Sequence, residues 1–138
     1  MKIDQQYLKN LLIAFEDNEG PQTNINELKD LGFDYSDQKF IFHMRLLDDQ
    51  NLIARTDGRA GFGLYIGADD EGSWAVLPLR LTARGHDFIA ALRQQEVWNS
   101  VRENFKEAGL STLIDVSKEL AKGFALKQVK RLTGYGPD

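Results

Sequence analysis

The chain has 138 residues, no cysteine and a formal net charge of −4. A domain of this length can bury a core without a staple, and the absence of cysteine excludes disulfides, thiolate metal sites and a cysteine nucleophile. No apolar run approaches the ~20 residues of a membrane span, and the first ten residues lack the apolar core of a signal peptide. We therefore expect a cytoplasmic protein that folds as one domain and needs no metal or cofactor.

Two helices are predicted in the first 35 residues. Asp4 suits the N-cap of the first, and apolar residues then recur at helical spacing as far as Phe15. Gly20 and Pro21 follow and cannot continue a helix. A shorter helix begins after a cap at Thr23 or Asn24 and should end at Gly32.

Residues 36–52 predict a third helix, around which the rest of the chain is organised. We expect Ser36 to cap it. A helical wheel places four side chains on the inner face: Phe40, His43, Met44 and Leu47. Phe42 and Leu46 flank that face, and Ile41 lies among polar residues. A helix this apolar is expected to pack on several sides, with His43 as a hydrogen-bonded core histidine.

A β-ribbon is predicted next. Residues 52–55 should form a strand, residues 56–63 a glycine-rich turn, and residues 64–66 a short second strand. The acidic residues 69–71 are expected to form a polar hairpin turn, because they lack the spacing of a calcium loop. Residues 73–81 should form the returning strand, at an edge or bulged at Pro78, which has no N–H group.

Thr82 is expected to cap a fourth helix. Its two apolar groups, beginning at Phe88 and at Val97, lie on opposite sides of an ideal helix. The segment therefore either bends at residues 94–96 or changes its packing partner within one helix, and the absence of Gly and Pro between Gly85 and Gly109 favours one helix. Ser111 should cap a final basic, amphipathic helix that Gly123 interrupts.

This order of elements predicts an α+β, mostly α fold: a winged helix-turn-helix with a C-terminal helical extension. We expect residues 1–95 to form the winged-helix domain. Residues 96–138 should form the helical extension, packed on that domain or on a partner.

Four short motifs occur in this order along the chain. They are Phe42-His43-Met44-Arg45-Leu46-Leu47, Leu52-Ile53, Leu81-Thr82-Ala83-Arg84-Gly85-His86-Asp87-Phe88 and Val97-Trp98. The chain thereby resembles the bacterial and prophage family known as domain of unknown function 2513, over roughly residues 38–107. The resemblance implies a winged-helix protein of prophages and mobile elements, and implies no activity. Many relatives have Gly before Leu-Ile where this chain has Gln50-Asn51, and Asn tolerates the left-handed conformation that such a position requires.

DNA binding in a regulatory or mobile-element context is the leading functional hypothesis. The third helix would enter the major groove of double-stranded DNA, with base or phosphate contacts from Gln38, Lys39 and Arg45. Phosphate contacts would come from Arg55, Arg59 and Arg80. The acidic balance opposes this: residues 1–35 carry three Lys/Arg and seven Asp/Glu, residues 36–82 five and seven, and residues 83–138 nine and seven. A solvated polar face is the alternative.

A protein-interaction module, such as a subunit, inhibitor or anti-repressor, is the competing hypothesis. Ile41, Phe42 and Leu46 lie outside the core face of the third helix and would form one exposed apolar patch. The interface would also use Trp98, Val101 and Phe105, with Leu120 and Phe124 of the tail. The tail folding back over this face is the favoured alternative, and a homodimer formed by the C-terminal helices is a third possibility.

We expect no enzymatic activity and no small-molecule substrate. His86 and Asp87 are adjacent on a helix and point about 100° apart, so they cannot form a relay with each other.

Overall fold

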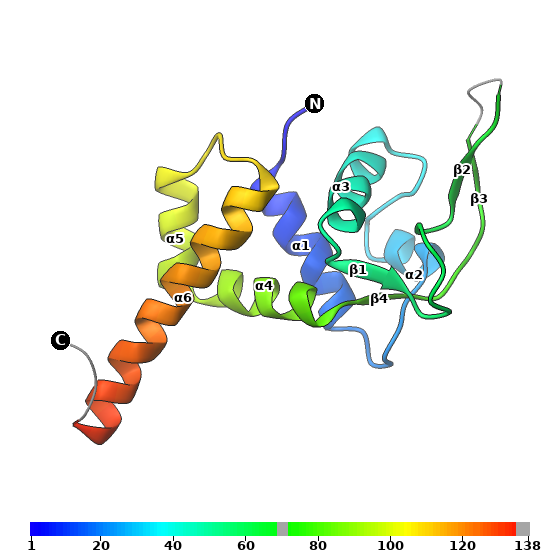
Figure 1. Cartoon of the computed structure of the whole chain (residues 1–138). Helices are drawn as coiled ribbons and strands as arrows, with labels where there is room; N and C mark the ends of the chain where they lie inside the picture. The colour runs from blue at the N-terminus through cyan, green and yellow to red at the C-terminus, as the bar shows by residue number, and fades with distance from the viewer. Residues whose placement is uncertain (69–71, 135–138) are drawn as a thin grey trace. The chain divides into compact units, whose positions relative to one another are not determined.

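The computed structural model describes residues 1–68 and 72–134, and its described part is α+β and mostly helical, as predicted (Figure 1). It divides into two compact units, Met1–His86 and Asp87–Asp138. The division falls inside α4 (Ala83–Arg93), whereas the sequence favoured a boundary at residue 95. The hairpin turn expected at residues 69–71 lies outside the described residues.

Three helices open the first unit: α1 (Gln5–Glu16), α2 (Ile25–Asp30) and α3 (Gln38–Asp49). Asp4 and Asn24 cap α1 and α2 through their side chains, as predicted. The expected Ser36 cap of α3 is wrong. The N–H and hydroxyl of Ser36 both donate to the Asp34 carboxylate at 2.9 Å, so Asp37 accepts the Lys39 N–H at 3.1 Å instead.

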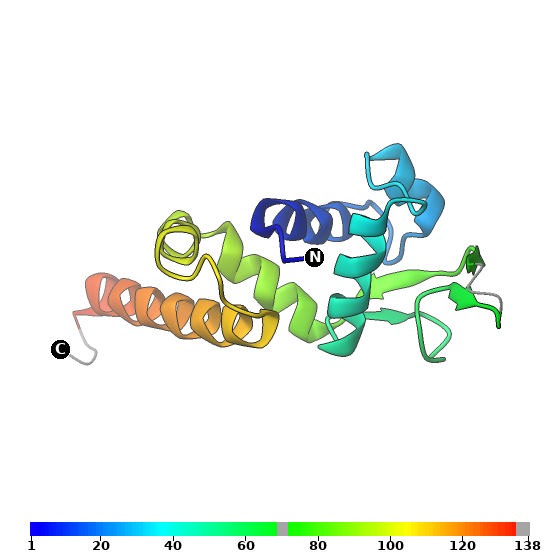
Figure 2. The same ribbon diagram turned by 90° about the horizontal axis from the view of Figure 1, so that it is seen from above.

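The strands form two antiparallel pairs, which lie beside the helices in Figure 2. β1 (Ile53–Arg55) pairs with β4 (Leu79–Leu81), and β2 (Leu64–Ile66) pairs with β3 (Gly72–Trp74). Leu79 also exchanges two backbone hydrogen bonds with Thr23, of 2.8 and 2.9 Å, so β4 lies between Thr23 and β1. The single returning strand predicted over residues 73–81 is wrong: residues 75–78, which include Pro78, separate β3 from β4.

The inner faces of α1, α2 and α3 meet the β1–β4 pair in the core of the first unit. Its largest fully buried apolar side chains are Leu8, Leu11, Leu12, Ile25, Leu28, Phe40, Met44, Leu47, Leu52 and Leu79. The β2–β3 ribbon is attached to this core through Trp74, whose ring centroid lies 5.7 Å from that of Tyr35 and 5.9 Å from those of Phe40 and Phe62. The inner face of the third helix is therefore the one that the helical wheel predicts.

A close backbone junction joins β4 to α4. The Thr82 hydroxyl donates to the Asn51 carbonyl at 2.6 Å and accepts the Gly85 N–H at 3.1 Å, which confirms Thr82 as the helix cap. Asn51 has φ = 57°, the left-handed conformation expected of it. A Cβ on Gly85 would lie 2.2 Å from the Leu52 carbonyl oxygen. The Leu-Thr-x-x-Gly motif therefore holds the start of α4 close to the backbone of Asn51 and Leu52.

The second unit contains the end of α4, then α5 (Gln95–Asn104) and α6 (Leu110–Thr133). The continuous helix favoured for residues 85–109 is wrong, because Gln94 adopts an extended conformation with ψ = 124°. This break lets the apolar groups on either side of Gln94 each pack inward. Gly109, not Ser111, is the N-cap of α6, and the helix runs without a break through Gly123 to a left-handed Gly134.

Candidate functional site

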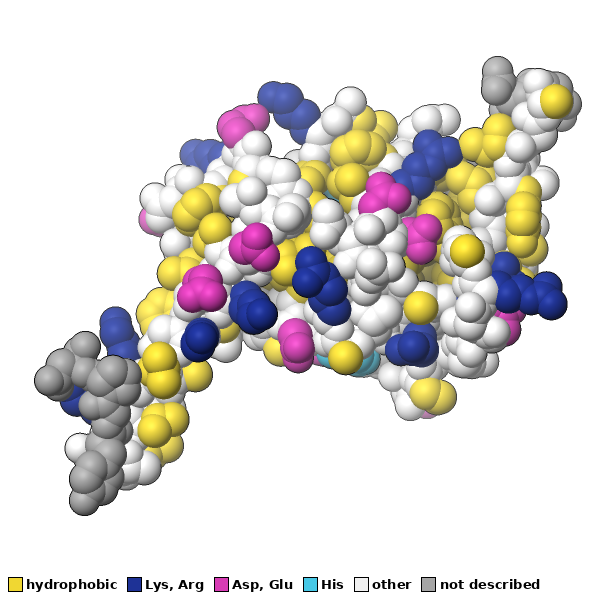
Figure 3. Space-filling model, viewed as in Figure 1, with side chains coloured by type: hydrophobic (Ala, Val, Ile, Leu, Met, Phe, Trp, Pro, Cys, Tyr) yellow, Lys and Arg dark blue, Asp and Glu magenta, His cyan; other side chains and the backbone are white. Residues whose placement is uncertain are grey.

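The outer face of α3 forms a shallow, partly apolar hollow of about 350 Å³. Its lining residues are Met1, Gln38, Ile41, Phe42, Arg45, Leu46 and Asp49. Six of these residues, all except Met1, lie on α3, on the side opposite the buried Phe40, His43, Met44 and Leu47. Three half-buried apolar side chains therefore lie between a guanidinium and a carboxylate. Figure 3 shows hydrophobic surface among charged side chains over α3.

The chain before α1 is fixed against α3 by His43. The His43 ring is fully buried: Nδ1 donates to the Lys39 carbonyl at 2.7 Å and Nε2 accepts the Asp4 N–H at 3.1 Å, so the neutral imidazole satisfies both partners. Burial lowers the pKa of His43, which favours this neutral form. His43 is therefore the hydrogen-bonded core histidine that the sequence predicts.

Lys39 is part of the same attachment rather than of the α3 hollow. Its ammonium lies 2.6 Å from the Asp4 carboxylate and 5.0 Å from the centroid of the Tyr7 ring. The hydrogen bond from Lys39 holds the pKa of Asp4 below its usual value, and burial raises the pKa of Tyr7 to about 12. The charge of Lys39 is thus partly neutralised within the fold.

The three arginines predicted to contact phosphates do not line the α3 hollow. The Arg55 side chain is only 8% exposed, and its guanidinium makes hydrogen bonds of 2.6 and 3.0 Å to the Asp57 carboxylate. The Arg80 guanidinium donates to the Leu81 carbonyl at 3.1 Å from the exposed side of β4. Arg59 is exposed in the turn after β1. Of the six predicted contacts, only Gln38 and Arg45 line the hollow.

The electrostatics of the first unit are acidic. Residues 1–86 carry nine Lys/Arg and fourteen Asp/Glu, a formal charge of 9 − 14 = −5. Two of the carboxylates, Asp48 and Asp49, end α3 beside Arg45. Burial, with a smaller contribution from Asp49, raises the pKa of Asp48. A polyanion approaching α3 would meet this negative charge, so the surface is poorly suited to phosphate.

The second predicted interface is largely internal. Trp98 and Val101 are buried, while Phe105, Leu120 and Phe124 are half-buried. Helices α5 and α6 contact each other, and the Arg102 guanidinium lies 5.4 Å from the centroid of the Trp98 ring. The part of this apolar face on α5 is therefore unavailable to a partner while the chain keeps this conformation.

The sequence indicated the apolar side chains of the α3 hollow as part of a candidate partner surface, because Phe42 and Leu46 lie beside the core face and Ile41 lies in the polar arc. Ile41 in a polar arc was the available signal, because a hydrophobic side chain at a solvent-facing position is expected either to pack or to bind. Met1 gave no such signal, since its position depends on the attachment of the N-terminal segment by His43 and Lys39.

Within residues 1–68 and 72–134, no three His, Asp or Glu side chains gather as potential metal ligands. None of the helices formed by these residues is both long enough and apolar enough to cross a membrane. His86 is exposed at the start of α4.

Comparisons with known proteins agree with the motifs. A protein of Haemophilus influenzae (strain ATCC 51907 / DSM 11121 / KW20 / Rd), described as "Uncharacterized protein", is 25% identical over 122 residues, which cover 88% of this chain and 93% of that protein. No solved structure matches the chain. The family model described as "Hypothetical protein (DUF2513)" matches residues 2–111. The chain therefore belongs to the DUF2513 family.

Proposed function

We propose that residues 1–86 form a winged-helix unit that binds a protein partner through the outer face of α3. The winged-helix assignment is supported by the order of the elements and by the antiparallel arrangement of Thr23, β4 and β1, with the β2–β3 ribbon as the wing. The helix that reads DNA in many helix-turn-helix proteins would here present a protein-binding surface.

The apolar character of the α3 hollow is the observation that carries this proposal. Ile41, Phe42 and Leu46 line it between Arg45 and Asp49. Interface cores are depleted in charge and are anchored by apolar or aromatic side chains with a few polar groups around them. The matching partner is an amphipathic segment with an apolar anchor for the hollow and a carboxylate placed to meet Arg45.

Site-specific photo-crosslinking in cells tests the proposal. A crosslinking residue at Leu46 should capture one defined protein, whereas the same residue at Asn26, exposed on α2, should not. Adding Arg45→Glu to the Leu46 probe should abolish the capture, because the guanidinium would be replaced by a like charge facing the partner's carboxylate. Equal capture at both positions, or capture that survives Arg45→Glu, would contradict the proposal.

DNA binding is the second candidate, and the exposure of Gln38, Arg45, Arg59 and Arg80 favours it. Fluorescence anisotropy with mixed-sequence duplexes at ~50 and ~200 mM salt measures it directly. Affinity that falls steeply with salt and weakens in Arg45→Ala would establish DNA as the ligand of α3. The absence of binding at the lower salt concentration would exclude this candidate.

A further inference from the structure

The C-terminal part of α6 is amphipathic, and its apolar side chains are not buried against the rest of the chain. Ser117 is the last buried residue of α6, and every residue from 125 to 133 is exposed. Leu126, Val129 and Leu132 are 42%, 49% and 73% exposed, and their spacing of three places them along one side of the helix. Figure 3 shows hydrophobic and basic side chains along this part of α6.

A helical segment that leaves its apolar side in water is expected to be only marginally stable. Most helical stability in proteins comes from packing of an amphipathic face, and short isolated helices are marginal. Gly123 weakens the helix further, by about 1 kcal/mol relative to Ala. A surface that accepts Leu126, Val129 and Leu132 would supply the missing packing.

The charge of the segment defines that surface. Residues 120–134 contain four Lys/Arg and no Asp/Glu. The complementary surface must therefore combine apolar side chains with carboxylates and should lack basic residues.

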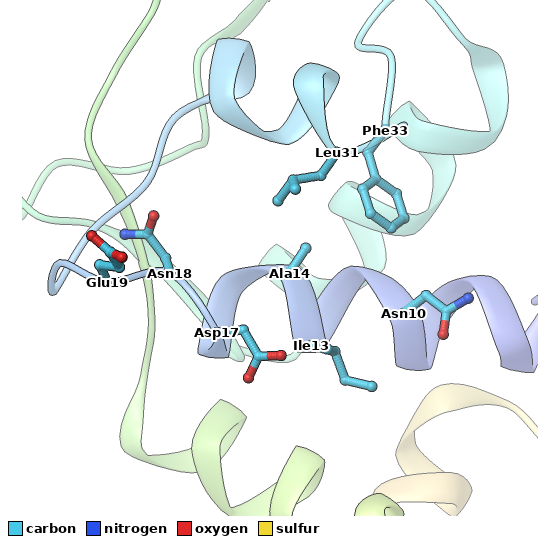
Figure 4. Close-up of a pocket in the computed structure, with 8 residues that line it drawn as sticks. All are labelled: Asn10, Ile13, Ala14, Asp17, Asn18, Glu19, Leu31 and Phe33. Carbon is cyan, nitrogen blue, oxygen red and sulfur yellow. The ribbon is translucent and has the colours of Figure 1, made fainter.

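The first unit carries a surface of this kind between α1 and α2. Its hollow of about 560 Å³ is lined by Asn10, Ile13, Ala14, Asp17, Asn18, Glu19, Leu31 and Phe33. Figure 4 shows Leu31 and Phe33 pointing towards α1, with Asp17 and Glu19 towards one end of the hollow. Leu31 is 61% exposed although it is apolar. Residues 10–28 contain four Asp/Glu and no Lys/Arg.

We propose that the end of α6 binds in the α1–α2 hollow of a second copy of the chain. Leu126, Val129 and Leu132 would cover Leu31 and Ile13, while Lys122 and Lys130, which flank this apolar side of the helix, would face Asp17 and Glu19 of the other copy. Both surfaces occur on every chain, so the donor and the acceptor are present in equal amounts. Two reciprocal contacts close a dimer, and one-way contacts extend into longer oligomers. The α3 hollow takes no part in this contact.

Sedimentation equilibrium with charge-reversed variants tests this contact. The wild type should associate with increasing concentration to multiples of 15.6 kDa. The tail variant Lys122→Glu/Lys130→Glu and the hollow variant Asp17→Lys/Glu19→Lys should each raise the dissociation constant at least about tenfold. Unchanged circular dichroism melts would show that each variant keeps its fold, and Lys122→Arg should associate as the wild type does.

Mixing the two reversed variants gives the decisive result. Each reversed tail then meets a reversed hollow of opposite charge, so the mixture should regain the association that each variant loses alone. A monomeric wild type would overturn the proposal, as would association unaffected by both variants or no recovery on mixing. A monomer that binds anionic phospholipid vesicles through the same tail residues would assign the helix to a lipid surface instead.

Discussion

The junction at Gly85 gives the sharpest prediction about stability. Gly85→Ala adds one methyl group in the first turn of α4. Its Cβ would lie 2.2 Å from the Leu52 carbonyl oxygen and 3.1 Å from the Leu52 carbonyl carbon and Leu81 Cδ2. Real contacts of this kind are essentially never under 3.0 Å, so the two backbone segments must separate by at least about 0.8 Å.

The expected change in the free energy of unfolding combines one stabilising and two destabilising contributions. Alanine is the better helix former by about 1 kcal/mol, which would stabilise the variant if space were available. Overpacking a close contact costs about 1–3 kcal/mol. Moving the Leu52 carbonyl also weakens its 3.0 Å hydrogen bond from the Thr82 N–H, a loss of about 0.5–1.5 kcal/mol. We therefore expect Gly85→Ala to lower the free energy of unfolding by roughly 1–3 kcal/mol.

Urea unfolding followed by far-ultraviolet circular dichroism measures this difference. Gly123→Ala is the matched control, because a Cβ at Gly123 in α6 has no heavy atom within 4 Å. The control should unfold at the same or a higher urea concentration than the wild type, since it gains helix propensity without a clash. A Gly85→Ala variant as stable as the wild type would refute the close packing of α4 on Leu52.

Three further predictions concern single hydrogen bonds or dihedral angles. Thr82→Ala removes both hydroxyl hydrogen bonds and should cost about 1–2 kcal/mol in urea unfolding, whereas Thr82→Ser should retain most of this stability. Asn51→Ala should destabilise by about 1 kcal/mol because of the left-handed φ, and Asn51→Gly should not; equal effects would contradict that reason. Stability should fall as the pH falls below 6.5 towards the lowered pKa of folded His43, because the unfolded chain takes up the proton first. That pH dependence should disappear in thermal melts of His43→Gln and persist in His86→Gln, which changes an exposed histidine.

The sequence by itself determined the helices of the first unit and their buried faces. Asp4, Asn24 and Thr82 were identifiable as caps because capping depends on the side chain and on the few residues that follow it. The inner face of α3 was predictable because hydrophobic periodicity is a local property of a helix. Of the four family motifs, the first lies on α3, and the others lie at β1, across β4 and the start of α4, and in α5.

Local patterns gave the wrong answer where competing partners decide the outcome. Ser36 suits a helix cap, but the carboxylate of Asp34 engages its hydroxyl. No Gly or Pro breaks residues 86–108, yet the chain breaks at Gln94, where the apolar groups on either side change phase. Helix and strand ends depend on such contacts more than on propensity.

Only the tertiary structure decided which charges remain available at a surface. Arg45 and Arg55 are equally basic in the sequence, but β1 and the following turn hold Arg55 against Asp57, whereas Arg45 lines the hollow on α3. Likewise, Trp98 and Leu126 are both apolar residues at helical spacing, and only the folded chain buries the first and exposes the second. Pairing and burial join residues far apart in the chain, so spacing along the sequence cannot determine them.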